Sequence, residues 1–399
     1  MIIHNKFHNK LKCKISKYAK LVLKKLNKYG YQAFIVGGSV RDVILNKIPK
    51  DFDVTTNATP EQICKLFKYS RIIGKRFKIV HLFFKKKIIE VSTFRGDHIK
   101  KNKKIRNKSQ KTIHGMLLRD NIFGNIREDA FRRDITINSL YYNPNDFGIR
   151  DYVGGIKDLK NKKIKLIGNP IIRYKEDPIR MLRVIRFSIY LNMSISYKTS
   201  QAIAPLSKLI INVSPSRLFD ELIKLFNKGN IYYTYKILRR YLLFHAIFPH
   251  ISKYFTKNES SNIELMIKLI LKNYYKINKK NNISLVIASM FWYPQLNFFF
   301  KNIFSIKKKY NNECELKIND SIRKISINLL IPKKIILIIR QIWKLQFFLL
   351  QKKSKTNFKV IKHPRFYLGY MLLKMRANVE KTKELKYYVN FWTNKKFNF

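Results

Sequence analysis

Phe34-Ile-Val-Gly-Gly-Ser-Val-Arg-Asp42 and Asp51-Phe-Asp53 lie close together near the start of the chain. The apolar residues before Gly37 predict a short strand, and those after Gly38 predict a helix. Small residues at such a strand-to-helix turn allow the backbone to approach a phosphate group closely. A glycine pair that only closes a tight turn is an equally common alternative, so the turn alone does not define a function.

A pair of carboxylates follows this turn. Twelve residues separate Gly38 from Asp51, and Asp51 and Asp53 lie in a predicted second strand. Alternate residues of a strand point to the same face, so we expect the two carboxylates to converge. Their repulsion would be relieved by a hard cation such as Mg²⁺, which can also hold substrate phosphates. Glu90, in a further strand predicted at 87–94, is a candidate third ligand, although an edge-exposed acid is the simpler interpretation of this residue alone.

Strand signals are confined to the first part of the chain. A third strand is predicted at 78–84 and a helix at 126–139, and the residues before Ala33 include an amphipathic helix. From Asp177-Pro178 onward, cap chemistry and helical periodicity predict successive amphipathic helices. The expected fold is therefore α+β, a mixed sheet with helices followed by an all-α part. The predicted domains are a basic leader (1–26), a catalytic head (27–172), a helical neck for nucleotide and RNA (173–250) and a helical RNA-binding body (251–399).

The charge balance predicts a polyanionic partner. The chain has 83 Lys and Arg against 24 Asp and Glu, a net charge of +59, and seven of the twelve residues 100–111 are Lys or Arg in a predicted basic loop. Compositional drift toward Lys, Asn and Ile explains part of this excess, but the potential would still attract nucleic acid, with anionic membrane surfaces second. The apolar run 335–339 is far shorter than the about 20 residues of a spanning helix, so we expect a cytoplasmic protein without membrane insertion.

Four motifs in a fixed order resemble the class II branch of the polymerase-β superfamily, which contains bacterial poly(A) polymerases and tRNA CCA-adding enzymes. The motifs are Phe34–Asp42, Asp51–Asp53, Arg132-Arg-Asp-Ile-Thr-Ile-Asn138 and Glu176-Asp-Pro-Ile-Arg-Met-Leu-Arg-Val-Ile-Arg-Phe187. The resemblance is strongest over residues 30–250. It implies a polymerase-β-like nucleotidyltransferase head, an all-α neck and body, ATP as substrate, and two Mg²⁺ ions, with Mn²⁺ as an alternative.

The resemblance assigns roles to individual residues. Asp51, Asp53 and Glu90 would be catalytic and hold the metal ions, and Asp134 would be catalytic or, as we interpret it, position the nucleotide. Asp134 and Asn138, four residues apart in the predicted helix, would share a face and hold the ribose. The nucleotide-binding set is Gly37, Gly38, Ser39, Arg41, Arg133, Asn138, Asp177, Arg180, Arg183, Arg186, Arg217 and Glu221.

Some of these assignments have a simpler alternative. Asp177 and Arg180 would read the adenine edge, but Asp177 can also act as an N-cap. Arg133 can belong to a solvated basic turn. Arg217 and Glu221 can form a surface ion pair worth about 0.3–0.5 kcal/mol.

The segment Ile72–Phe83 resembles the signature that separates bacterial poly(A) polymerases from CCA-adding enzymes. The predicted reaction is therefore template-independent addition of AMP from ATP to RNA 3′ ends, which would promote RNA turnover. CCA addition to tRNA is the alternative within the family, and a catalytically degenerate basic RNA-binding protein is the alternative outside it. RNA 3′ ends, ATP and RNA-degradation machinery are the expected partners, and a monomer is the expected state.

Overall fold

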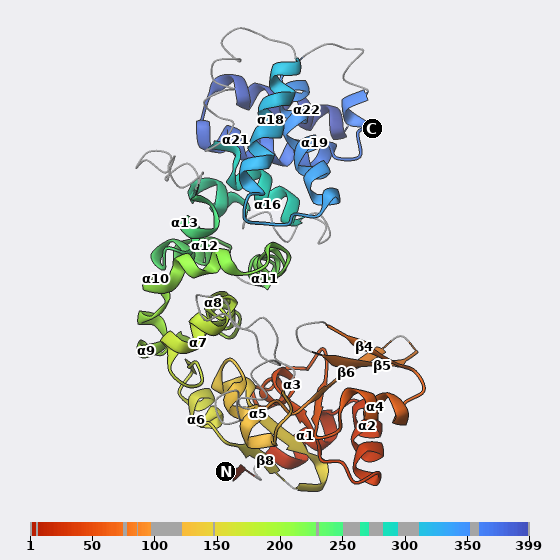
Figure 1. The fold of residues 1–399 in the computed structure, drawn as a ribbon. Helices are drawn as coiled ribbons and strands as arrows, with labels where there is room; N and C mark the ends of the chain where they lie inside the picture. Colours follow the sequence, from red (N-terminus) through yellow and green to blue (C-terminus); the bar gives the residue numbers. More distant parts are fainter. Residues whose placement is uncertain are drawn as a thin grey trace. The chain divides into compact units, whose positions relative to one another are not determined.

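The computed structural model describes residues 2–4, 7–74, 78–85, 87–96, 122–146, 148–228, 231–249, 264–270, 282–293, 311–351 and 359–397. The chain divides into two compact units, Met1–Leu206 and Ser207–Phe399, which we call the N-terminal and C-terminal units (Figure 1). The first contains a mixed sheet with helices and the second is helical in its described residues. The expected α+β fold is thereby confirmed.

An eight-stranded mixed sheet forms the centre of the N-terminal unit, in the order β1-β8-β7-β2-β3-β6-β5-β4. Neighbouring strands are antiparallel except for β3 and β6, which run parallel. The strands predicted before Gly37, at 78–84 and at 87–94 are confirmed, with small shifts at their ends. The strands are β1 (Ile2–His4), β2 (Ala33–Val36), β3 (Asp53–Thr56), β4 (Ser70–Ile73), β5 (Ile79–Phe84), β6 (Lys87–Thr93), β7 (Leu140–Asn143) and β8 (Gly148–Asp151).

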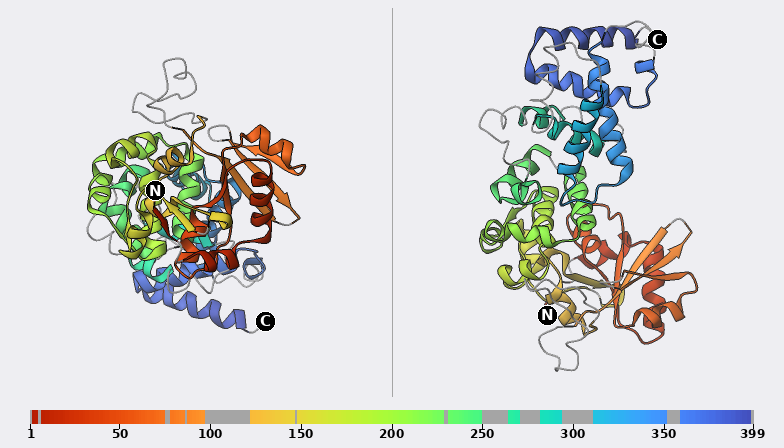
Figure 2. Two further views of the ribbon diagram at one scale, coloured as in Figure 1. Left: turned by 90° about the horizontal axis from the view of Figure 1, so that it is seen from below. Right: turned by 45° about the horizontal axis from the view of Figure 1, so that its top comes forward.

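Several helices contact the sheet. Helix α2 (Lys17–Lys28) contacts β2 and β3, and α4 (Pro60–Leu66) contacts β4 and β5, as the views in Figures 1 and 2 show. The predicted amphipathic helix is confirmed in α2, whose apolar side chains are buried at helical spacing. Helix α4 begins with a capping box in which Thr59 and Gln62 exchange hydrogen bonds. The remaining helices near the sheet are α1 (His8–Lys14), α3 (Gly38–Ile44) and α6 (Gly155–Lys160).

The helix predicted at 126–139 is wrong in its second half. Helix α5 spans Ile126–Arg132, and a short 3-10 helix, η3, follows at Thr136–Asn138. Between them, Ile135 forms an isolated β-bridge to another segment, a conformation that its β-branched side chain favours. Asp134 therefore lies outside any helix and does not share a helical face with the residue four positions later.

The helices predicted from Asp177 onward are confirmed within the described residues. Asp177 is not the N-cap: it ends α7 (Pro170–Glu176), and Pro178 occupies the cap position of α8 (Ile179–Leu191). Two-residue strands β9 (Lys163–Ile164) and β10 (Ser194–Ile195) pair beside α8. The other elements are α9 (Tyr197–Gln201), α10 (Ile203–Leu206), η5 (Ser207–Asn212), α11 (Pro215–Lys228), α12 (Ile231–Arg240), α13 (Leu243–Ile247), α16 (Asn282–Met290), α18 (Asn312–Ile325), α19 (Lys333–Leu349), α21 (Phe366–Glu380) and α22 (Lys383–Phe397).

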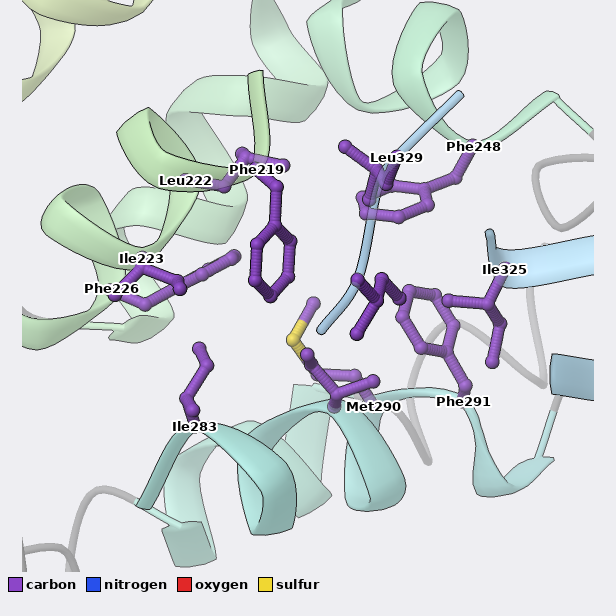
Figure 3. Close-up of a pocket in the computed structure, with 12 residues that line it drawn as sticks. Phe219, Leu222, Ile223, Phe226, Phe248, Ile283, Met290, Phe291, Ile325 and Leu329 are labelled. Carbon is purple, nitrogen blue, oxygen red and sulfur yellow. The ribbon is translucent and has the colours of Figure 1, made fainter. Parts of the chain in front are cut away.

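The C-terminal unit has its own apolar core. Gly369 lets α21 approach α19, because a Cβ there would lie 2.9 Å from the Leu345 side chain. Trp392 of α22 is buried and donates its indole N–H to the Leu349 carbonyl at 2.7 Å. A small cavity between α11, α16 and their neighbours is lined by apolar side chains such as Phe219 and Phe291 (Figure 3). Within the described residues, no helix combines the length and apolarity that crossing a bilayer requires.

Candidate active site

Gly37 stands at the turn between β2 and α3, where three polar groups converge. Its φ of +81° and ψ of −133° are accessible to glycine at little cost and to other residues only with strain. A Cβ at this position would lie 3.8 Å from the Asn138 carbonyl, 3.9 Å from Arg133 Nη1 and 4.0 Å from Asp53 Oδ2. A carboxylate and a guanidinium thus face the same short stretch of backbone.

Two of the predicted carboxylates lie side by side on neighbouring strands. Asp53 is the first residue of β3 and is the register partner of Glu90 on the parallel strand β6. Asp51 precedes the strand, so the expectation that both aspartates belong to one strand is wrong, because β3 begins at Asp53. Although Asp53 keeps solvent access, loss of water around its carboxylate raises its pKa to about 6, with further increases from Glu90 and Asp51 and an opposing effect of Arg133.

The chemistry of this donor set fits a divalent cation. Burial is the main cause of the raised pKa of Asp53, and repulsion from Glu90 and Asp51 adds to it; a bound cation would offset both effects. Among the described residues, no group of three or more His, Cys, Asp or Glu side chains is close enough to hold a metal ion alone. Glu90 is instead 3.5 Å from Nε2 of His81. One or two carboxylates completed by water and substrate phosphate are typical of Mg²⁺ sites.

Arg133 is held at the turn by a buried network. Asp129 accepts hydrogen bonds from Arg133 at 3.0 and 3.1 Å and from the Tyr141 hydroxyl at 2.7 Å, and that hydroxyl accepts from Arg133 Nε at 2.9 Å. Burial disfavours the guanidinium charge, but Asp129 and Tyr141 outweigh burial and raise the pKa of Arg133. A permanent positive charge beside Asp53 and Gly37 suits a phosphate ligand.

A second network links the motif after α5 to helix α8. Asp134 accepts hydrogen bonds from Arg183 at 2.6 and 2.7 Å and from the Ile135 amide at 2.9 Å. Burial raises the pKa of Asp134, but Arg183 and these hydrogen bonds dominate and hold it well below its usual range. Asp134 therefore fixes Arg183 and remains ionised.

Arg41 and helix α8 meet at the ring of Phe187. Arg41 is buried, donates to the Asn138 side chain, and pairs with Asp42 at 2.7 Å. The guanidinium groups of Arg41, Arg183 and Arg186 lie 5.2, 5.8 and 4.5 Å from the centroid of Phe187. The side chain of Asn138 thus accepts a hydrogen bond from Arg41 in this structure. Three guanidinium groups surround the ring of Phe187.

Arg180 belongs to a third network, between α7 and α8. Glu176 accepts from Arg180 at 3.1 Å and from Arg173 at 2.7 Å. Arg173 also donates to the backbone carbonyls of Arg132 and Arg133, which anchors α7 to the segment after α5. Burial and nearby cations lower the pKa of Arg173 to about 10. Asp177 follows α7 directly and accepts the Arg180 amide at its carbonyl.

Arg217 and Glu221 belong to the C-terminal unit, whereas the residues described above belong to the N-terminal unit. Both lie on α11 of the C-terminal unit, four residues apart, with Glu221 buried. Ser39 is buried behind the turn, with its hydroxyl 3.4 Å from the Val36 carbonyl. The predicted basic loop at 100–111 and residues 75–77 of the Ile72–Phe83 segment lie outside the described residues.

Further residues, to which the sequence motifs assigned no role, hold the predicted site residues in place. Asp42, Asp129, Tyr141, Arg173 and Phe187 each contact a predicted site residue. One usable signal was the i, i+4 spacing of Asp129 and Arg133 behind the capping box of α5. The Tyr141 contact depends on the position of β7 beside α5, which local sequence does not encode.

Family models match three parts of the chain. Residues 33–165 match the poly(A) polymerase head domain, 192–255 the probable RNA and SrmB-binding site of polymerase A, and 308–398 the polymerase A arginine-rich C-terminus. The chain is 48% identical over 381 residues to poly(A) polymerase I of Escherichia coli O6:H1, covering 95% of this chain and 82% of that protein.

CCA-adding enzymes are more distant in sequence. That of Enterococcus faecalis is 35% identical over 209 residues, covering 52% of this chain and 48% of the enzyme. The structure of the Thermotoga maritima CCA-adding enzyme complexed with tRNA has a TM-score of 0.65 at 18% identity, covering 99% of this chain and 86% of that one. Sequence similarity over most of this chain is therefore to poly(A) polymerase I, and the chain shares its fold with a CCA-adding enzyme.

Proposed function

The chain belongs to the poly(A) polymerase I family and adds AMP from ATP to RNA 3′ ends without a template, and we propose that the residues around Gly37 carry out this transfer. The single observation that supports the proposal is that Arg133 Nη1 and Asp53 Oδ2 lie 3.9 and 4.0 Å from the point beside the Gly37 backbone where a Cβ would stand. This arrangement places a carboxylate, a fixed guanidinium and a glycine backbone without a Cβ around one point. Nucleotidyl transfer requires such preoriented charged groups around the reacting phosphate.

The reaction is in-line attack of the RNA 3′ hydroxyl on the α-phosphorus of ATP. A new phosphorus–oxygen bond to RNA forms as the bond to pyrophosphate breaks. Asp51, Asp53 and Glu90 would hold two Mg²⁺ ions, or Mn²⁺ in their place. When bound, such ions would activate the hydroxyl and neutralise charge on the phosphates.

The chain's own residues position the nucleotide. Arg133, fixed by Asp129 and Tyr141, faces the space beside Gly37 that a phosphate would enter. Arg183, fixed by Asp134, adds a second cation. Because both arginines are already oriented before ATP binds, little reorganisation is needed at the moment of transfer.

Base selection is assigned to the start of α8. Asp177 would accept from adenine N6, and Arg180, oriented by Glu176, would donate to a ring nitrogen. Asn138 would contribute to ribose binding through its link to Arg41. Ser39 and Gly38 complete the turn. Arg186 adds positive charge, and the family resemblance assigns Arg217 and Glu221 to the support of the nucleotide.

The wider assignments are part of the same proposal. The four domains would divide at residues 26, 172 and 250, the protein would act as a monomer in the cytoplasm, and its tails would recruit RNA-degradation machinery. These features follow from the family resemblance, and the positive charge of the chain is consistent with RNA as a partner.

Asp53→Asn tests the proposed site directly. It keeps the size of the side chain but removes the charge, so AMP incorporation into RNA should be lost while RNA binding is retained. The matched control is Glu61→Gln, which changes an exposed carboxylate on α4, away from Gly37. Undiminished incorporation by Asp53→Asn over a range of Mg²⁺ concentrations would reject the assignment of Asp53.

A further inference from the structure

A row of polar side chains crosses four strands beside the proposed site. The strand registers pair Arg71 on β4 with His81 on β5, His81 with Glu90 on β6, and Glu90 with Asp53 on β3. Register partners in a sheet point to the same face. These four residues, which we call the polar row, therefore lie on one face with the catalytic carboxylates at its end.

An apolar row runs parallel to the polar row on the same face. Phe83 is the register partner of Ile88 and donates its amide hydrogen to the Tyr69 carbonyl at 3.0 Å, which continues the β4–β5 pairing by one residue. Phe83 and Ile88 stand two positions from His81 and Glu90, about 7 Å along their strands. The apolar row thus begins one step away from the proposed metal ligands.

In the part of the chain that the structure describes, the side chains of the apolar row are exposed, whereas those on the other face of the same strands are buried. Tyr69, Phe83 and Ile88 are 71%, 41% and 48% exposed. The alternate residues of β5 and β6, such as Leu82 and Ile89, are buried, on the side where α4 packs. Neighbouring exposed apolar side chains of this kind mark interaction surfaces.

We propose that the apolar row is the docking surface for the 3′-terminal nucleotides of the RNA substrate. The bases stack on the rings of Tyr69 and Phe83 and against Ile88, and the terminal ribose turns toward Asp53 and Glu90. This inference rests on the proposed function, because it places the attacking hydroxyl at those carboxylates.

Three features favour RNA as the occupant. The row is continuous with the proposed site, where the RNA 3′ end must lie during transfer. Lys85 and Lys87 are exposed in the hairpin beyond Phe83, so phosphates leaving the site meet positive charge. Stacking on aromatic rings tolerates any base, which fits an enzyme that extends RNA without a template.

Steady-state kinetics of the full chain can measure this contribution. In Tyr69→Ala and Phe83→Ala, the KM for RNA should rise about 5- to 150-fold, the loss expected for one stacked base. The KM for ATP should stay unchanged, and Phe83→Trp should restore the KM for RNA. Tyr197→Ala is the matched control, since Tyr197 is 74% exposed on α9 of the same unit and belongs to neither row.

A binding measurement without turnover separates this inference from the proposed function. RNA carrying 2-aminopurine at its 3′ terminus should lose fluorescence on binding to the wild type, and less so with Tyr69→Ala or Phe83→Ala. The same label at the 5′ end should respond equally in all proteins. If wild-type protein transfers no AMP, the proposed function fails, yet this quenching still reports whether the bases stack.

Three results would overturn the inference. One is an unchanged KM for RNA in both alanine variants of an active enzyme. Another is a rise in the KM for ATP alone, which would assign the row to the incoming nucleotide. The third is equal loss of signal from 3′- and 5′-labelled RNA, which would indicate a general binding surface.

Discussion

Gly37→Ala tests whether the space beside the β2–α3 turn belongs to the substrate. The backbone there has a φ of +81° and a ψ of −133°, so an alanine costs about 1–3 kcal/mol of strain. The added methyl would lie 3.8–4.0 Å from Asn138, Arg133 and Asp53, at ordinary contact distance, so the folded site should accept it. The methyl would, however, occupy the point on which these groups converge.

The expected result is a loss of activity far larger than the loss of stability. Displacing a reacting group by about 1 Å can cost about 100-fold in rate, and we expect at least this fall in kcat/KM for ATP. Gly154→Ala is the control for a positive φ, because Gly154 has the same φ of +81°, with a ψ of +25°, and an added Cβ there would meet no atom of the described residues within 4 Å.

Thermal unfolding and ATP-dependent labelling of RNA should be measured on both variants. Each should lower the melting temperature by about 2–4 °C per kcal/mol of strain, while Gly154→Ala retains its activity. Equal activity losses in the two variants, or full activity in Gly37→Ala, would refute a substrate role for this turn.

Three further predictions concern electrostatics and packing. Asp134→Asn should lower stability at neutral pH by about 1–3 kcal/mol, since it removes the partner of Arg183. Because folding depresses the pKa of Asp134, the wild-type advantage should be full above about pH 4 and shrink as the pH falls below it, as thermal unfolding across pH would show. Phe291→Ala should lower the free energy of unfolding by about 3–5 kcal/mol, because the buried ring lines the cavity of the C-terminal unit (Figure 3). Calorimetry measures this loss, and an unchanged unfolding transition would contradict the prediction. The logarithm of RNA affinity should fall linearly with the logarithm of salt concentration, with a slope of about −0.7 per phosphate neutralised; salt-independent binding would exclude a mainly electrostatic interface.

Local sequence was sufficient for the elements that set up the site. The strand before Gly37, the helix after it and the start of β6 follow from periodicity and from glycine at a turn that requires positive φ. The order of the four motifs was sufficient to predict the fold, because each motif occupies a fixed place in the family that the chain resembles. The local elements depend on residues adjacent in the chain, and the fold assignment depends on the identity and order of the motifs; both can be read from the sequence.

Tertiary contacts explain what sequence analysis could not predict. The helix expected through Asp134 ends early because Ile135 bridges to Leu166, thirty-one residues later in the chain. Strand β7 is buried at all four positions, so it lacks the alternation that would have marked it as a strand. The pairing of Asp134 with Arg183 likewise requires α8 to pack beside that segment.

The nucleotide and the RNA that the protein accepts distinguish polyadenylation from CCA addition. Purified protein would receive either a generic RNA or a tRNA that lacks its 3′ end, with ATP or CTP and Mg²⁺, and products would be resolved by length. We expect ATP to extend the generic RNA beyond three nucleotides and CTP to extend it hardly at all. Addition that requires tRNA, begins with CTP and stops after three nucleotides would contradict this expectation.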